Sequence, residues 1–228
     1  MAAEPTAAYV LHSRPYRDTS LLVDFFTLEQ GKVSAVAKGA RRPNSKLRSS
    51  IQPLVPLQIN WGGRQELKSL INAEPVAPTM LLQGNALLCG LYVNELLDRL
   101  MLPFDPHPQL YVYYQYVLNE LLSGEDIEGG LRTFEHRLLS ELGLMPDLSD
   151  KKSDQIYRYE ADTGFKPVVN VSEPQKHSCF YGSQLMAIAE DDYNEIQNKR
   201  AAKRLMRQLI DKALNYKPLR SRDLFQKM

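Results

Sequence analysis

The sequence predicts an α+β protein in which a small N-terminal β-barrel precedes a mostly helical region. Short apolar runs alternate with polar residues and are separated by glycine turns through residues 1–75. After residue 78 the apolar residues recur at helical spacing instead. We therefore expect a barrel domain over 1–78 and a helical domain, with a small β-hairpin insert, over 79–228.

Five strands are expected in the barrel domain. Glycine turn signals lie at 30–31 and 62–63. The fourth strand contains Pro53 and Pro56, which a strand tolerates only at an edge or a bulge. Five short strands fit an OB-type barrel, and an SH3-like barrel is the alternative. The expected strands cover residues 9–11 (ending near 14–15), 21–26, 32–37, 52–61 and 66–73.

Helices dominate the second domain. Three of them with short links predict a bundle over 79–145. A polar linker and a hairpin turned at Asp162–Gly164 occupy 146–182, and C-terminal helices occupy 183–228. The expected helices cover 81–101, 109–122, 131–142 (closed by Gly143) and 198–214, before a short tail helix, and the hairpin strands cover 156–159 and 165–169.

Composition favours an ordinary globular protein of a reducing compartment. Apolar residues make up 43% and charged residues 24% of the chain. No stretch reaches the roughly 18 apolar residues of a membrane helix, and no secretory leader is visible. Cys89 and Cys179 suit a protein with free thiols, although one disulfide is the alternative. We expect a cytoplasmic protein without a membrane partner.

Charge is segregated along the chain. Residues 1–80 hold ten basic and six acidic residues, residues 81–150 three and eleven, and residues 151–228 fifteen and ten. Basic ends around an acidic middle favour nucleic-acid contact at the ends, and solvated faces are the alternative reading.

The basic loop at 38–48 is the sharpest local feature. It holds five cations and no acid, which predicts a salt slope of roughly −3.5 on single strands, at about 0.7 per phosphate. Two arginines of the first inter-strand loop could add to it. The expected DNA contacts in the barrel are Arg14, Arg17, Lys38, Arg41, Arg42, Lys46 and Arg48.

Aromatic residues of the barrel could stack on bases. Tyr16 and Trp61 are the candidates for exposed rings. Phe25 and Phe26 are adjacent in a strand, so one should face the core and the other should face outward.

Two helices carry further candidates. On the last long helix Arg200, Lys203, Arg204 and Arg207 fall within an arc of about 100°, which could contact phosphates, contact an acidic peptide or simply be solvated. On the third helix an apolar stripe could hold an acidic, aromatic peptide end, and a plain core stripe is the alternative. The residues proposed for that groove are Arg132, Phe134 and Arg137.

Catalytic and metal patterns are missing from the sequence. It contains no Walker loop, GxSxG, HExxH or GxGxxG motif. His177 and Cys179 are two potential metal ligands, whereas a structural zinc site needs four. We expect no enzyme activity, no metal and no cofactor.

Several motifs together resemble the RecO family of recombination mediators. They span nearly the whole chain in the family's order, and the first two are the most specific. The motifs are VLHSRPYRDTSLLVDFFT (10–27), GKVSAVAKGARRP (31–43), the run from Gln52-Pro53 through GGRQELKSLINAE (62–74), GLYVNELL (90–97), LRTFEHRLLSELG (131–143), AAKRLMRQLI (201–210) and KPLRSRDLF (217–225).

The resemblance implies an OB barrel, a helical C-terminal part, and binding and annealing of single- and double-stranded DNA. It implies work with RecR in replacing single-stranded-DNA-binding protein by RecA, recognition of that protein's acidic tail, and association with the nucleoid. The family's basic barrel positions map onto Lys38, Arg41 and Arg42. Many relatives carry a four-cysteine zinc module where this chain has only Cys179, so residues 146–182 are expected to be metal-free.

Three other functions remain open from the residues alone. They are an RNA-binding barrel protein, an adaptor that binds only proteins, and a metal nuclease, which would need clustered carboxylates.

Overall fold

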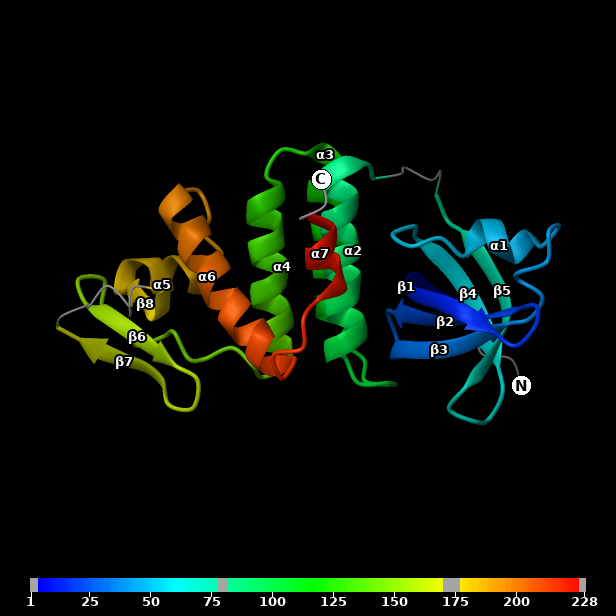
Figure 1. Cartoon of the computed structure of the whole chain (residues 1–228), viewed down its shortest axis with the longest axis horizontal. Coiled ribbons are helices and arrows are strands. Elements are labelled where there is room, and N and C mark those ends of the chain that lie inside the picture. The colour runs from blue at the N-terminus through cyan, green and yellow to red at the C-terminus, as the bar shows by residue number, and fades with distance from the viewer. Residues whose placement is uncertain (1–3, 78–81, 170–176, 226–228) are drawn as a thin grey trace. The chain divides into compact units, whose positions relative to one another are not determined.

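The computed structural model describes residues 4–77, 82–169 and 177–225. They form two compact units (Figure 1). Unit 1 contains residues 1–124 and 219–228, and unit 2 contains residues 125–218. The boundary expected at residue 78 lies outside the described residues and stays a prediction. Within the described residues, every helix is too short or too polar to cross a membrane.

Unit 1 contains a closed barrel with strand order β1-β2-β3-β5-β4, in which β4 pairs back onto β1. All pairs are antiparallel except β3 with β5. This topology confirms the five-stranded OB-type barrel. The elements are β1 (Thr6–Tyr16), β2 (Ser20–Thr27), β3 (Gly31–Ala37), the short helix α1 (Lys46–Ser50), β4 (Leu57–Gly62) and β5 (Lys68–Pro75).

The strand bounds differ from those expected around the prolines. We expected a fourth strand from residue 52, but β4 begins at Leu57. Pro53 and Pro56 lack the amide hydrogen that a ladder needs, and Pro53 makes only an isolated bridge to Val10. The basic loop is also shorter than expected, because α1 begins at Lys46.

Alternating side chains of the strands fill the barrel. In β4, Leu57, Ile59 and Trp61 are buried while the residues between them are partly exposed. Trp61 pairs with Leu70 of β5 in this core and is only 3% exposed. The expectation that Trp61 offers an exposed ring is therefore wrong, because the strand period of two turns it inward.

Phe25 and Phe26 do face opposite sides of β2, yet both are fully buried. Phe25 belongs to the barrel core. Phe26 lies outside the barrel, with its ring centroid 5.3 Å from Tyr111 and 5.8 Å from Tyr114. The outward face of β2 is therefore covered by a helix and is unavailable for stacking on bases.

Helices α2 (Gly84–Leu100) and α3 (Pro108–Ser123) provide this cover. The register of β1 shifts between Val10 and His12 as it pairs with β2. Asn94 of α2 is buried at that shift, and its amide donates to the carbonyl oxygens of Val10 (2.9 Å) and Leu11 (3.3 Å). The hydroxyl of Tyr114 donates to Asn94 Oδ1 (2.6 Å), which joins strand, α2 and α3 at one point.

The chain leaving α2 docks on the turn between β2 and β3. The amide of Phe104 donates to the carbonyl of Lys32 (3.0 Å), and the Phe104 ring packs against the barrel core. Gly31 has φ of +64°, and a Cβ there would lie 1.9 Å from the carbonyl oxygen of Asp105. This turn therefore requires glycine.

Unit 2 combines helices with a three-stranded sheet of order β7-β6-β8. The expected hairpin is β6–β7, but the third strand was missed, because its apolar run of three residues is too short to predict a strand. Phe180 of β8 packs against Phe165 of β7, with 5.9 Å between centroids. The elements are α4 (Ile127–Glu141), β6 (Ile156–Glu160), β7 (Gly164–Val168), β8 (Cys179–Tyr181), α5 (Gly182–Ala189) and α6 (Ile196–Ala213).

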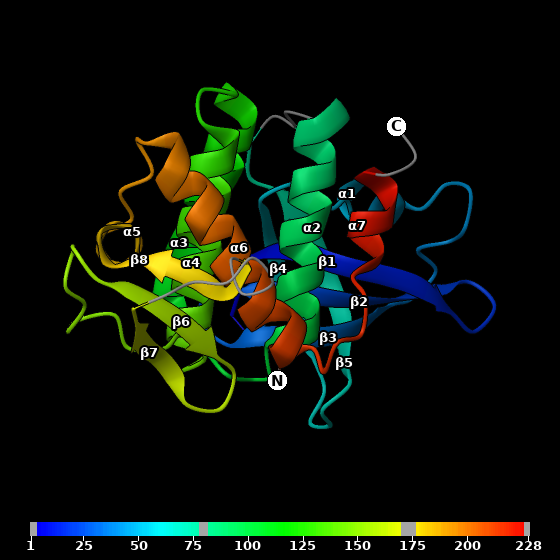
Figure 2. The same ribbon diagram turned by 60° about the vertical axis from the view of Figure 1, so that its left-hand side comes forward.

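The last helix, α7 (Arg220–Phe225), returns to unit 1 and lies beside α2 (Figure 2). Glu95 of α2 accepts hydrogen bonds from the amides of Arg220 (2.9 Å) and Ser221 (2.8 Å) and from the Ser221 hydroxyl (2.6 Å). Leu219 and Ser221 are buried. One carboxylate thus holds the start of α7.

Replacing Asn94 with Ala should destabilise unit 1 by about 3 kcal/mol, because the carbonyls of Val10 and Leu11 lose a buried donor. Urea unfolding of the variant measures this. Tyr114→Phe removes a single hydroxyl and should cost only about 1 kcal/mol. A loss below about 0.5 kcal/mol for Asn94→Ala would contradict the role given to this amide.

The attachment of α7 should depend on pH. Burial alone would raise the pKa of Glu95, but hydrogen bonds from Ser221, Arg220 and Arg99 hold it below the ordinary 4.5. A lowered folded pKa means that the contribution is complete above pH 4.5 and is lost as the pH falls through the folded value.

NMR shifts of the Ser221 amide should therefore titrate with a midpoint below 4.5. In Glu95→Gln this transition should disappear, and α7 should exchange its amides faster at neutral pH. A midpoint at or above 4.5 would show that the carboxylate does not hold α7.

Candidate nucleic-acid interface

The β1–β2 turn and the loop at 38–45 lie side by side at one end of the barrel, as Figures 1 and 2 both show. The Arg41 amide donates to the Thr19 carbonyl (2.9 Å). The Arg41 guanidinium donates to the carbonyls of Arg17 (3.3 Å) and Asp18 (3.2 Å). These bonds combine cations from two separate segments into one surface.

The loop is anchored by one buried apolar residue among its cations and another just after them. Ala40 is fully buried and Ile51 is 5% exposed. Leu47 of α1 packs against the barrel core, so that Lys46 and Arg48 beside it are exposed. The loop is therefore held on a folded support, which presents its charges to solvent.

We call the exposed cations at this end the basic edge. Among the residues the structure describes, five of its six members have neither an acidic partner within 4.0 Å nor a hydrogen bond from their charged groups, and the sixth, Arg41, bonds only to backbone oxygens. Asp18 is the acid in the same turn. The members are Arg17, Lys38, Arg41, Arg42, Lys46 and Arg48.

Arg14 lies apart from the basic edge. It belongs to strand β1 and not to the turn, and its guanidinium pairs with Asp24 at 3.0 Å. Asp24 is almost fully buried and also accepts from Ser34. The charge of Arg14 is therefore balanced, and the expectation that it stands in the inter-strand loop is wrong.

Tyr16 ends strand β1 and is half-buried, so it remains a candidate for base stacking. The guanidinium carbon of Arg17 lies 5.3 Å from the centroid of its ring. A planar cation over an aromatic ring at a loop is a common platform for unpaired bases.

The cationic stripe on α6 is largely engaged within unit 2. Lys203 lies 3.9 Å from Glu128, and Arg207 lies 3.8 Å from Asp211. Arg204 donates to the Cys179 carbonyl (3.2 Å) and stands 5.1 Å from the centroid of the Phe180 ring. Of the four, Arg200 alone has no such contact to the described residues. The stripe thus offers less free charge than the basic edge.

The residues expected to form a groove on α4 lie mostly in the core. Phe134 is fully buried, and Arg132 is 6% exposed and pairs with Glu135 at 2.7 Å. Arg137 donates to Asp191 (2.7 Å), which also contacts His136. The expectation of an open apolar groove around Phe134 is wrong, because the helical spacing places that ring on the buried face of α4.

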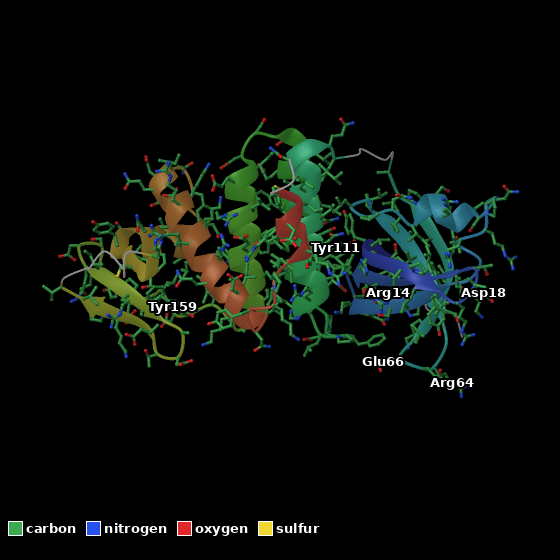
Figure 3. All side chains as sticks on the ribbon, viewed as in Figure 1. Arg14, Asp18, Arg64, Glu66, Tyr111 and Tyr159 are labelled. Carbon is green, nitrogen blue, oxygen red and sulfur yellow. The ribbon has the colours of Figure 1, made fainter. Side chains whose placement is uncertain are left out.

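One exposed cation of the barrel, Arg64, was not among the DNA contacts expected from the sequence. Arg64 lies exposed on the β4–β5 loop beside Glu66, and Figure 3 shows both on this loop, away from Asp18 of the β1–β2 turn. OB barrels use this loop for nucleic acids, so the Gly62–Gly63 turn was the available signal. In the described part of the chain, no group of three or more metal-ligating residues is present.

Comparison with known proteins gives a consistent family. The model described as recombination protein O N terminal matches residues 1–79, and the one described as recombination protein O C terminal matches residues 81–155. Proteins named DNA repair protein RecO match nearly the whole chain. That of Pseudomonas putida is 44% identical over 98% of this chain and 97% of its own length. The protein of Methylococcus capsulatus is 40% identical over 96% of this chain and 91% of its own length. The protein of Coxiella burnetii is 39% identical over 98% of this chain and 97% of its own length.

Proposed function

Because this chain belongs to the recombination protein O family, we propose that it binds single- and double-stranded DNA through the basic edge of its barrel. The observation that carries the proposal is the set of exposed cations on a folded support without acidic partners among the described residues. Release of counterions from phosphates would supply most of the affinity.

We further propose that the protein anneals complementary strands without making or breaking bonds. Cations that hold two strands close together lower the repulsion between their phosphates, and pairing then proceeds by itself. With RecR, the protein would help RecA to replace single-stranded-DNA-binding protein on DNA. These proposed roles are the ones that the family resemblance implies, and in them the protein would act in the cytoplasm, at the nucleoid.

Recognition of the acidic tail of single-stranded-DNA-binding protein belongs to the same proposal. The buried positions of Arg132 and Phe134 leave them out of reach, so we assign the tail contact to Arg200 and Arg207 of α6. Arg200 is exposed, and the side chain of Arg207 is 69% exposed, which leaves room for carboxylates of a peptide.

Removing two charges from the basic edge should flatten the dependence of binding on salt. Lys38→Ala with Arg42→Ala removes two phosphate contacts, so the slope of log K against log salt on a single strand should fall by about 1.4. Fluorescence anisotropy with a labelled oligonucleotide from 50 to 300 mM salt, roughly the range where such slopes are linear, measures it.

The matched control is Lys152→Ala with Lys166→Ala, which removes two exposed charges from unit 2 and should leave the slope unchanged. An unchanged slope in the Lys38/Arg42 variant would remove the basic edge from the interface. If Lys203→Ala with Arg207→Ala then lowered the slope, the interface would lie on α6.

The purified protein should anneal complementary strands coated with single-stranded-DNA-binding protein, and should do so poorly when that protein lacks its acidic tail. Arg200→Ala with Arg207→Ala should reproduce the defect on coated strands and leave the annealing of bare strands intact. Equal annealing rates on strands coated with intact and with tail-less single-stranded-DNA-binding protein would refute the tail contact. Failure of the parent protein to anneal bare strands would refute the annealing activity itself.

A further inference from the structure

The β1–β2 turn contains a strained residue. Arg17 has φ of +51°, in the left-handed region that favours glycine, asparagine and aspartate. A long side chain adopts this backbone only where its surroundings enforce it. The enforcing contacts therefore matter for how Arg17 and Tyr16 are presented.

Arg41 makes those contacts. Its amide and guanidinium together bond to the carbonyls of three consecutive turn residues, Arg17, Asp18 and Thr19. One guanidinium nitrogen, Nη1, makes both side-chain bonds, since it carries two hydrogens held in the plane of the group. The Nη1 donor that could meet a phosphate is used on the turn instead.

We propose that Arg41 is a positioning residue that makes the barrel prefer unpaired DNA. It holds the strained turn so that the Tyr16 ring and the Arg17 guanidinium form a stacking platform beside Lys38 and Arg42. Only an unpaired base can reach such a platform, since duplex bases are stacked on each other. The inference rests on the proposed DNA binding at the basic edge.

The geometry separates Arg41 from its neighbours on this surface. Lys38 and Arg42 are exposed and make no hydrogen bond from their charged groups to the described residues, so either can meet a phosphate directly. A lysine in place of a phosphate-binding arginine still supplies the charge. A lysine in place of Arg41 keeps the charge, but its side chain ends one atom short of Nη1, the nitrogen that donates to the carbonyls of Arg17 and Asp18, and its donors are not fixed in a plane.

The test is Arg41→Lys, measured against single-stranded and duplex oligonucleotides of equal length over a range of salt. Affinity for the single strand should fall about tenfold, the scale of one lost base stack, and affinity for the duplex less than about threefold. The salt slope should not change, because no charge is lost. Arg14→Lys, a charge-conserving change in the same barrel, is the matched control and should behave as the parent.

NMR of the free proteins gives a readout that does not depend on DNA. The amides of Arg17, Asp18 and Thr19 should shift in Arg41→Lys and stay in place in Arg14→Lys, while the remaining barrel amides show that both variants fold.

Affinities equal to the parent on both oligonucleotides would overturn the proposal, as would equal losses on single strand and duplex. If the parent protein bound neither oligonucleotide, the proposed DNA binding would be overturned as well. This outcome distinguishes failure of the proposed function from failure of the role given to Arg41.

Discussion

The contact of Asn94 with strand β1 is the constraint on which unit 1 depends. Where the register of β1 shifts, two successive carbonyls need a donor, and Asn94 supplies it from α2 while accepting from Tyr114 of α3. Buried carbonyls without partners are costly, so the helices must seat at this place and in this rotation. The aromatic rings of Tyr9 and Phe26 are then buried against Tyr114 of α3. The barrel and its two helices therefore belong to one compact unit.

Covering one side of the barrel decides which cations remain available. Helices α2 and α3 cover Tyr9 and Phe26 on the outward side of β1 and β2, and the exposed Arg14 is balanced by Asp24. Several cations of unit 2 are similarly engaged, as Lys203 with Glu128 and Arg137 with Asp191 show. The cations of the loop between β3 and α1 have no acidic partner among the described residues, and the loop itself contains no acid. Its exposed charges therefore remain available to a ligand, while the buried Ala40 and the partly buried Leu47 hold it on the barrel.

The fold was largely predictable, and the site was predictable in part. Glycine turns and alternation gave the five strands, since a barrel requires both. The start of β4 was misplaced, because the apolar run before it contains two prolines that cannot donate to a strand ladder. Strand β8 was missed, because three residues are too few to show an alternating pattern. Lone cations were harder: the sequence treats Arg14, Arg41 and Arg42 alike, but long-range contacts assign them to an ion pair, a turn and solvent. The expected exposure of Phe134 and Trp61 was wrong for the same reason, since the exposure of a side chain depends on which residues pack over it.

The central claim is that the basic edge is where DNA contacts this protein. Titrating a single-stranded oligonucleotide into ¹⁵N-labelled protein and following backbone amide shifts tests it most directly. We expect the largest shifts on residues 16–19 and 38–48 and little change in α6 and β6–β8. Shifts that concentrate on α6 while residues 38–48 stay unchanged would contradict it.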